Sequence, residues 1–443
     1  MRLTSPLLQK AAFQWLSSLK TAELKSIAQA TGVREAGPKA ALRQRLIRDL
    51  QRSEFLLSDE VLLSGSQEQS QGQDQQKQPP PRRGANGRDL SILSIDMGIQ
   101  NLAFAHFLVP APGMKSLSLS FEPKPTLNAW HRLAVLELPT GSSTLPPEVF
   151  TTLAKTNNMN NKDKNQNPQK TTEAAEEDIS AEEEELNLTK AGMFSMNVYA
   201  AQAYTLVASL IAAYQPTHIL IEKQRFRSGG RPAIQEWTLR VGVFEGMLHA
   251  VLHTLQQLGK CSVEAQRIDP KRVVRYWNLE ADDEDDANKK KKGKTKGLYN
   301  EVKKRKIDLV GRWLQAAREG GISESQQQQK LPKVDITELL SSSLSNSDAR
   351  DVVNAYLYKW NSRRLRTALD EPGVVKHLDK LDDLADCLLQ GMTWLQWQIM
   401  RARVAREGLG ALNDGSTNDS GSGSGSGSDS GDGNASTSQG EQS

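Results

Sequence analysis

The sequence predicts an α/β protein in which a mixed sheet is flanked by helices and a small helical unit comes first. Two short apolar runs, at 90–95 and 218–221, have the length and composition of buried strands, and a carboxylate follows each of them. Longer segments with apolar residues at helical spacing follow the second run. Before residue 50, two shorter apolar stripes predict the separate helical unit.

Three strands open the larger unit. The run at 90–95 ends at Asp96, and a second apolar run, 102–109, follows after so few residues that a hairpin is the expected connection. Residues 129–138 alternate between apolar and polar side chains, as a third strand would. These three strands are expected to form an antiparallel meander.

Helix and strand then alternate. A helical segment over 196–214 leads to a strand over 218–222 that ends in Glu222, and a long helix is expected over 233–258. A late apolar helix begins near Lys380. The loop after Glu222 is rich in polar and cationic residues, namely Lys223, Gln224, Arg225 and Arg227.

Polar low-complexity stretches divide the 443 residues into two folded units. We expect a helical domain over 10–50 and a larger domain over 88–405, joined by a Gln-, Ser- and Pro-rich linker over 64–87. The remaining polar stretches have too little apolar content to form a core and are predicted as two insertions and a tail, at 155–186, 281–332 and 412–443.

The overall composition excludes some classes of protein. A net charge of +3 does not by itself call for nucleic acid. Cys261 and Cys387 lack ligand spacing, so neither a disulfide framework nor a zinc site is indicated. No apolar run reaches the roughly 18 to 20 residues that span a bilayer, so no membrane is expected. Residues 1–22 contain no acid, which fits a mitochondrial presequence or the basic start of the first helix.

The helical unit carries a recognisable spacing of leucines, glycines and basic residues. Thr21 is expected to cap its first helix, and Gly32 and Gly37 bracket the turn. The pattern resembles a SAP motif, a helical unit that binds duplex DNA; the alternative is an amphipathic helical hairpin without that role. The resemblance implies phosphate contacts from the basic residues at the helix ends, Lys25, Lys39, Arg43 and Arg45.

Five carboxylates form the candidate catalytic set: Asp96, Glu222, Asp382, Asp383 and Asp386. On the late helix, Asp386 shares a face with both Asp382 and Asp383. One strand-end acid alone is more often a cap, but this ordered set is typical of RNase H-like nucleases, in which carboxylates hold two divalent metals around one phosphate. Oxygen-only ligands favour Mg²⁺, with Mn²⁺ as the alternative.

Several segments resemble the fungal mitochondrial cruciform-cutting resolvases, distant relatives of RuvC. They are 94–103 (SIDMGIQNLA), 221–227 (IEKQRFR), 269–271 (DPK) with Tyr276 and Trp277, and 380–386 (KLDDLAD). The resemblance implies an RNase H-like fold over 88–405 and metal-dependent cutting of four-way DNA junctions. It makes Asp96, Glu222, Asp383 and Asp386 the favoured metal ligands, while Asp382 stays open because it can also reach a metal.

The same resemblance assigns DNA contacts. Lys223, Gln224, Arg225, Arg227 and Lys271 would engage the DNA, mainly at its phosphates. For the run Lys303, Lys304, Arg305 and Lys306, a junction-binding surface and a solvated helix face are equally open.

Two other functions compete with a junction resolvase. One is a non-catalytic DNA-binding scaffold that uses the SAP-like unit, and the other is a nuclease acting on RNA–DNA hybrids, which the fold alone does not exclude. The retained carboxylates argue against the scaffold, and the sequence from Glu222 to Arg225 favours junctions. Family resemblance implies a homodimer, matching a two-fold symmetric substrate, and, with the acid-free start, mitochondrial residence.

Overall fold

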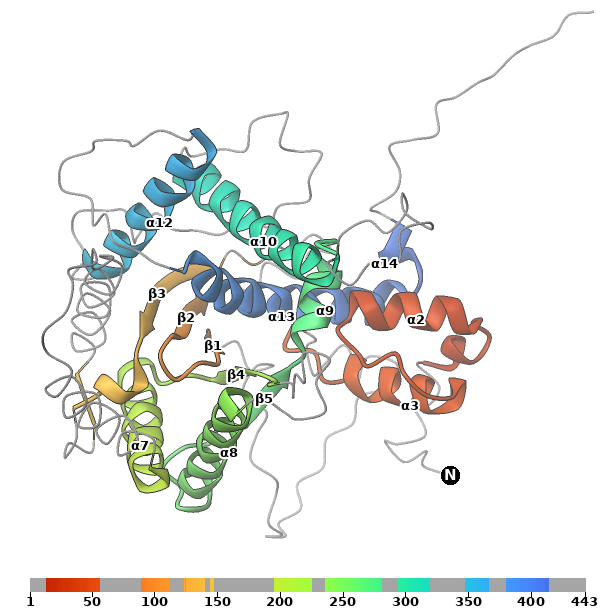
Figure 1. Cartoon of the computed structure of the whole chain (residues 1–443). Helices are drawn as coiled ribbons and strands as arrows, with labels where there is room; N and C mark the ends of the chain where they lie inside the picture. The colour runs from red at the N-terminus through yellow and green to blue at the C-terminus, as the bar shows by residue number, and fades with distance from the viewer. Residues whose placement is uncertain are drawn as a thin grey trace, which may run out of the picture.

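The computed structural model describes ten segments of the chain: 13–55, 89–110, 123, 125–139, 144–146, 195–224, 236–280, 294–318, 347–365 and 380–413. Within them a five-stranded mixed sheet, of order β3-β2-β1-β4-β5, is covered by helices on both faces (Figure 1). The α/β class predicted from the sequence is confirmed. The predicted linker at 64–87, the insertion at 155–186 and nearly all of the tail lie outside the described residues.

The sheet begins with the expected meander. β1 (Leu90–Asp96) pairs antiparallel with β2 (Leu102–Val109), and β2 pairs antiparallel with β3 (Thr126–Leu133). The third strand starts and ends earlier than the predicted 129–138. The backbone N–H of Val135 bonds to the carbonyl of Ile99, and the chain turns there into the short helix η2 (Val135–Glu137).

The second half of the sheet is parallel. β4 (His218–Glu222) pairs parallel with β1, and β5 (Ala265–Ile268) pairs parallel with β4. Because side chains alternate across a strand, β1 sends Leu93 and Ile95 to one face and Ile92 and Ser94 to the other. The sheet therefore has a separate apolar core on each face.

The first core lies under α7 (Met196–Tyr214) and α8 (Glu236–Gln257), which pack against each other on the Ile95 face. Among the described residues, α7 is the only helix long and apolar enough to span a membrane by length and composition. Core helices of globular proteins pass that test too, and about half of α7 is buried in this core.

The second core lies under α13 (Leu381–Glu407), which crosses β1 and β2. α9 (Pro270–Tyr276), α10 (Lys294–Arg318) and α12 (Ser347–Leu365) surround it (Figure 1). Gly391 lets α13 approach the sheet closely, because a Cβ there would lie 2.3 Å from the Phe107 ring.

The segment predicted as an insertion over 281–332 needs correction. Residues 294–318 of it form α10, whose side chains Val310, Trp313 and Leu314 are buried in the second core. Its backbone at Gly311 lies against the Trp360 ring of α12. This helix is an integral part of the domain. Its lysine run made the segment look like a polar insertion, although the helix also carries apolar residues at helical spacing.

The helical domain consists of η1 (Gln14–Ser17), α2 (Thr21–Ala30) and α3 (Lys39–Leu50). Lys20, and not Thr21, is the N-cap of α2, because the Glu23 carboxylate accepts the backbone N–H of Lys20 and so fixes the start one residue earlier. The small core is made of apolar side chains of this unit, among them Leu24, Ile27 and Leu46, together with Val404 and Ala411 from the C-terminal part of the chain.

This domain is fixed against the C-terminal half of α13 and the short α14 (Gly410–Asn413) (Figure 1). Gly32, with φ of +65°, lies against the Trp397 ring, where a Cβ would be only 2.1 Å away. Arg401 donates to the carbonyl of Thr31, and Arg275 of α9 forms an ion pair with Glu35 at 3.1 Å. Close packing and polar contacts thus join the two domains.

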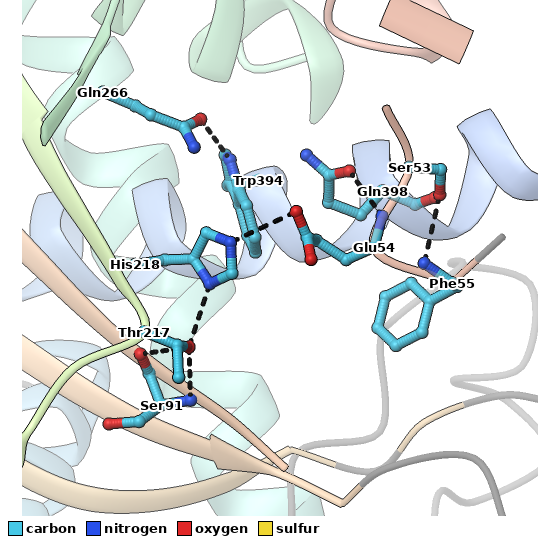
Figure 2. Close-up of polar contacts among 9 residues, drawn as sticks. All are labelled: Ser53, Glu54, Phe55, Ser91, Thr217, His218, Gln266, Trp394 and Gln398. Atoms are coloured by element: carbon cyan, nitrogen blue, oxygen red, sulfur yellow. Dashed lines mark hydrogen bonds and ion pairs between the residues drawn. The ribbon is translucent and has the colours of Figure 1, made fainter. Parts of the chain in front are cut away.

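A short strap after α3 continues this attachment (Figure 2). Ser53 donates to the carbonyl of Gln398, whose own amide oxygen accepts the backbone N–H of Glu54. The Glu54 carboxylate lies 3.3 Å from the His218 ring at the start of β4, and that ring packs on Trp394. The strap therefore links α3, α13 and the sheet.

Candidate active site

Two carboxylates meet at one edge of the sheet. The parallel register aligns Ile95 of β1 with Ile221 of β4, so the next residues, Asp96 and Glu222, end neighbouring strands side by side. Asp96 is only 7% exposed. Its burial, followed by the charge of Glu222, raises the pKa of Asp96 well above its usual range.

The first turns of α13 bring further carboxylates to the same edge. Asp386 and Asp383 both lie close enough to raise the pKa of Asp96 by their charge. Burial raises the pKa of Asp383 to about 7, with Asp382 adding to the effect. One oxygen of Asp383, Oδ2, is buried and has no hydrogen-bond partner among the described residues. The site therefore holds more negative charge than its surroundings balance.

Two lysines of α10 balance part of this charge. Lys306 lies 2.7 Å from Asp386 and Lys303 bonds to Asp382. Burial raises the pKa of Asp386 despite Lys306, whereas at Asp382 the contact with Lys303 outweighs burial and lowers the pKa. Lys304 is exposed. Arg305 bonds to Glu301 and to the carbonyl of Glu280. The run thus divides, with two of its four cations turned into the site.

The donor set fits a hard divalent cation. With the side chains in these positions, no three acidic, histidine or cysteine residues of the described part of the chain are grouped closely enough to hold a metal ion. Lys306 and Lys303 engage two of the acids, Asp386 and Asp382. The unpartnered oxygen of Asp383 and the repelling charges around Asp96 are the features that a cation would satisfy. All these donors are carboxylate oxygens, which Mg²⁺ prefers.

Comparison with known proteins shows which family this chain belongs to. Residues 92–404 match the family described as mitochondrial resolvase Ydc2 / RNA splicing MRS1, and residues 15–51 match the SAP domain. The chain belongs to the Ydc2/MRS1 family. The SAP resemblance of the helical unit is confirmed, and the first match contains all five predicted carboxylates.

Two individual relatives are similar to this member of the Ydc2/MRS1 family. The mitochondrial cruciform cutting endonuclease 1 of Schizosaccharomyces pombe is 38% identical over 77 residues, which cover 16% of this chain and 29% of that protein. The crystal structure of the yeast mitochondrial Holliday junction resolvase Ydc2 aligns at a TM-score of 0.41 with 19% identity, over 89% of this chain and 99% of that one. The chain thus matches less than a third of the curated relative's length.

The predicted DNA contacts of this family member fall into three groups. Lys25, Lys39, Lys223 and Lys271 are exposed and free to meet a phosphate, and Arg43 is half-buried. Arg45 instead donates to the carbonyls of Ala36 and Ala41, so its guanidinium braces the turn at Gly37. Arg225 and Arg227 lie outside the described residues.

Gln224 is also part of the site's framework. Its backbone N–H donates to Glu245 at 3.1 Å, and its amide lies 3.4 Å from Glu222. Glu245, buried on α8, also accepts from Arg267 at 2.7 Å. This carboxylate fixes the chain immediately after Glu222. Its only sequence signal is that it is an acid within an apolar helix.

Other residues that support the site also lack a distinctive sequence signal. Arg132, buried on β3, donates to Asn101 at 2.6 Å and acts to lower the pKa of Asp383. Ser94 and Gln390 connect β1 to α13 within the core. A buried polar residue in an apolar segment is a usable signal, but only the fold shows which residues it meets.

Proposed function

We propose that this protein is a metal-dependent endonuclease that resolves four-way DNA junctions. The convergence of Asp96, Glu222, Asp383 and Asp386 at one edge of the sheet carries the proposal. Membership of the Ydc2/MRS1 family and the SAP domain support a nucleic-acid substrate. The names of the relatives, a cruciform cutting endonuclease and a Holliday junction resolvase, support junction DNA as that substrate.

The carboxylates favour catalysis over the other activity in the family description, RNA splicing, and over a passive scaffold. Burying several like charges together is costly unless cations compensate them. A scaffold has no need of such a cluster, whereas phosphodiester hydrolysis by two metals requires it. The cluster is therefore evidence for a working hydrolytic site.

The roles of the residues follow from their positions. Asp96, Glu222, Asp383 and Asp386 would hold Mg²⁺, and the bound cation would supply Lewis-acid chemistry for hydrolysis of the phosphodiester. Lys223, exposed directly after Glu222, is placed to contact a phosphate next to the site. Glu245 holds the backbone of Gln224 and so fixes the direction of this loop.

A cleavage assay tests the proposal. Purified protein is incubated with a four-way junction, a linear duplex of the same sequence and an RNA–DNA hybrid, with Mg²⁺, with Mn²⁺ and with EDTA. We expect cutting of the junction alone, with either metal and not with EDTA. Cutting of the hybrid in preference to the junction would favour the RNA-directed alternative, and binding without any cutting would favour the scaffold.

The two-fold symmetry of a junction suits a homodimer, and we propose that the side of α7 and α8 that the other described residues leave exposed forms the contact. Large apolar side chains are exposed there, including Met196, Tyr204, Leu239 and Val243. Light scattering after size exclusion should give a dimer for the wild type and a monomer for Leu239→Glu combined with Val243→Glu. A dimer that survives both changes would place the interface elsewhere.

Mitochondrial residence is proposed from the family and the curated relative. Residues 1–22 contain no acid, but Phe13, Leu16 and Leu19 belong to the core of the helical domain. A fluorescent fusion at the C-terminus is expected in mitochondria. A fusion that stays in the nucleus or cytosol would contradict it.

A further inference from the structure

One buried amide touches all the elements that carry the active-site carboxylates. Gln390 of α13 is 3% exposed. Its Nε2 lies 3.1 Å from the Ser94 hydroxyl, 3.1 Å from the carbonyl of Ile95 and 3.4 Å from the carbonyl of Leu220. An amide nitrogen has two hydrogens, so these three acceptors share them.

Each acceptor lies one or two residues before a proposed metal ligand along the chain. Ile95 immediately precedes Asp96, and Leu220 is two residues before Glu222, on the same face of β4. Gln390 itself lies four residues after Asp386, one turn further along the same side of α13. One side chain thus connects the backbones of β1 and β4 to the helix that carries the other two acids.

Ser94 reinforces this connection. Its hydroxyl accepts from Gln390 and donates to the carbonyl of Cys387 at 2.8 Å, one residue after Asp386. Ser94 is completely buried. A buried amide costs free energy unless it is hydrogen-bonded, and an apolar side chain would fill this space without that cost. The polar contacts fix direction and distance, which apolar packing does not.

We propose that Gln390 is a positioning residue that sets the spacing between the strand-end carboxylates and those of α13, so that together they bind divalent cations in the geometry needed for cleavage. The inference rests on the proposed metal-dependent function. It assigns Gln390 no contact with the metal or the DNA.

Metal binding without DNA is the direct test. Mg²⁺ and Mn²⁺ are titrated by calorimetry into metal-free, full-length wild type, Gln390→Met and Gln398→Met. Methionine keeps the shape and removes the amide. Gln398 is the matched control, because it is equally buried on the same helix but its side-chain amide oxygen accepts the backbone N–H of Glu54, away from the carboxylates. Junction binding is measured in EDTA for each protein.

We expect Gln390→Met to bind Mg²⁺ about tenfold more weakly or worse, the range typical when the support of a metal ligand is lost. Mn²⁺ binding should fall less, because Mg²⁺ demands stricter octahedral geometry. Junction binding in EDTA should be unchanged, and Gln398→Met should bind both metals like the wild type. Wild-type affinity for Mg²⁺ in folded Gln390→Met would overturn the proposal.

If Gln390→Met does not fold, Ser94→Ala replaces it, since that change removes one acceptor of Gln390 and the bond to Cys387. It should weaken Mg²⁺ more than Mn²⁺, and equal affinity to the wild type would overturn the inference. The proposed function and the positioning role of Gln390 can be refuted separately. If the wild type binds no metal and cuts no junction, the proposed function itself is refuted. If the wild type binds metal and cuts junctions but Gln390→Met binds Mg²⁺ with the same affinity, only the positioning role is refuted.

Discussion

The ammonium of Lys306 on α10 lies 2.7 Å from the carboxylate of Asp386 on α13, in the middle of the acidic cluster. Burial acts to lower the pKa of Lys306, but Asp386, together with Glu222 and Asp96, outweighs it and the pKa is raised. This lysine therefore remains charged and occupies a carboxylate that a metal ion would also use.

Replacing Lys306 with methionine should accordingly strengthen Mg²⁺ binding by several-fold, because a competing positive charge is removed. The same variant should have a lower melting temperature without metal, and a larger increase on adding Mg²⁺, than the wild type. Calorimetry and thermal unfolding measure both effects. Lys304→Met, at an exposed position of the same helix, is the control, and equal behaviour of the two variants would contradict the competition.

The three aspartates of α13 should differ in importance. Asp386→Asn and Asp383→Asn are expected to abolish cleavage, since both charges act on Asp96 and Asp383 has an oxygen without a partner among the described residues. Asp382→Asn should lose only about 10- to 100-fold, as expected for a supporting residue paired with Lys303. Single-turnover rates over a Mg²⁺ titration measure the order. An inactive Asp382→Asn beside an active Asp383→Asn would exchange their roles.

The strand-end acids give a simpler prediction. Asp96→Asn and Glu222→Gln remove a charge with little change of shape, so cutting should be lost while junction binding in EDTA is kept. Gel-shift and cleavage assays on the same samples measure the two properties. Near-normal turnover in either variant would show that the metal site is elsewhere.

The SAP domain should contribute to DNA binding through exposed lysines. Lys25→Ala combined with Lys39→Ala is expected to weaken binding and to reduce the salt slope of log K by about two, with an unchanged melting temperature. Deleting residues 1–60 should weaken DNA affinity more than it lowers the single-turnover cleavage rate at saturation. It should also lower the melting temperature, because the apolar side chains Trp397, Val404 and Ala411 become exposed to solvent. If both the double lysine variant and the deletion bind DNA as tightly as the wild type, the SAP domain has no role in DNA binding.

His106 should make the fold sensitive to acid. Burial lowers its pKa to about 4, and its ring contacts Ser91 and Asn128. The unfolded chain binds a proton below about pH 6.5 while the folded one does not until about pH 4, so stability is complete above this window and falls within it as the pH drops. Urea unfolding should show a loss of about 2 kcal/mol between about pH 7 and about pH 5 from this residue. His106→Gln should lose correspondingly less, and an equal loss in the two proteins would contradict the assignment.

The sequence predicted the parts of the fold that depend on local pattern. The strands ending at Asp96 and Glu222, the helices near 196–214 and 233–258, and the late helix with its paired acids were all found, because hydrophobic periodicity shows them directly. β5 was missed, since its four residues, Ala265–Ile268, are too few and too exposed for a periodic signal.

The remaining features could not be predicted from the sequence, because they depend on contacts between residues far apart in the chain. α10 combines a lysine run with an apolar stripe and lies beside a polar stretch, so nothing local distinguished a core helix from an insertion. The pairing of Lys303 and Lys306 with aspartates about eighty positions later exists only after folding. Likewise, the local spacing of Arg45 could not show that its guanidinium also donates to the carbonyls of Ala36 and Ala41.

The sharing of α13 between two cores also has a consequence for biosynthesis. Leu24 and Leu46 leave the ribosome early, but Val404, which completes their core, is translated near the end of the larger domain. At roughly 5 to 20 residues per second, the interval is on the order of tens of seconds. During that time the N-terminal helices have an unfilled apolar surface, so a nascent chain needs protection there until α13 arrives.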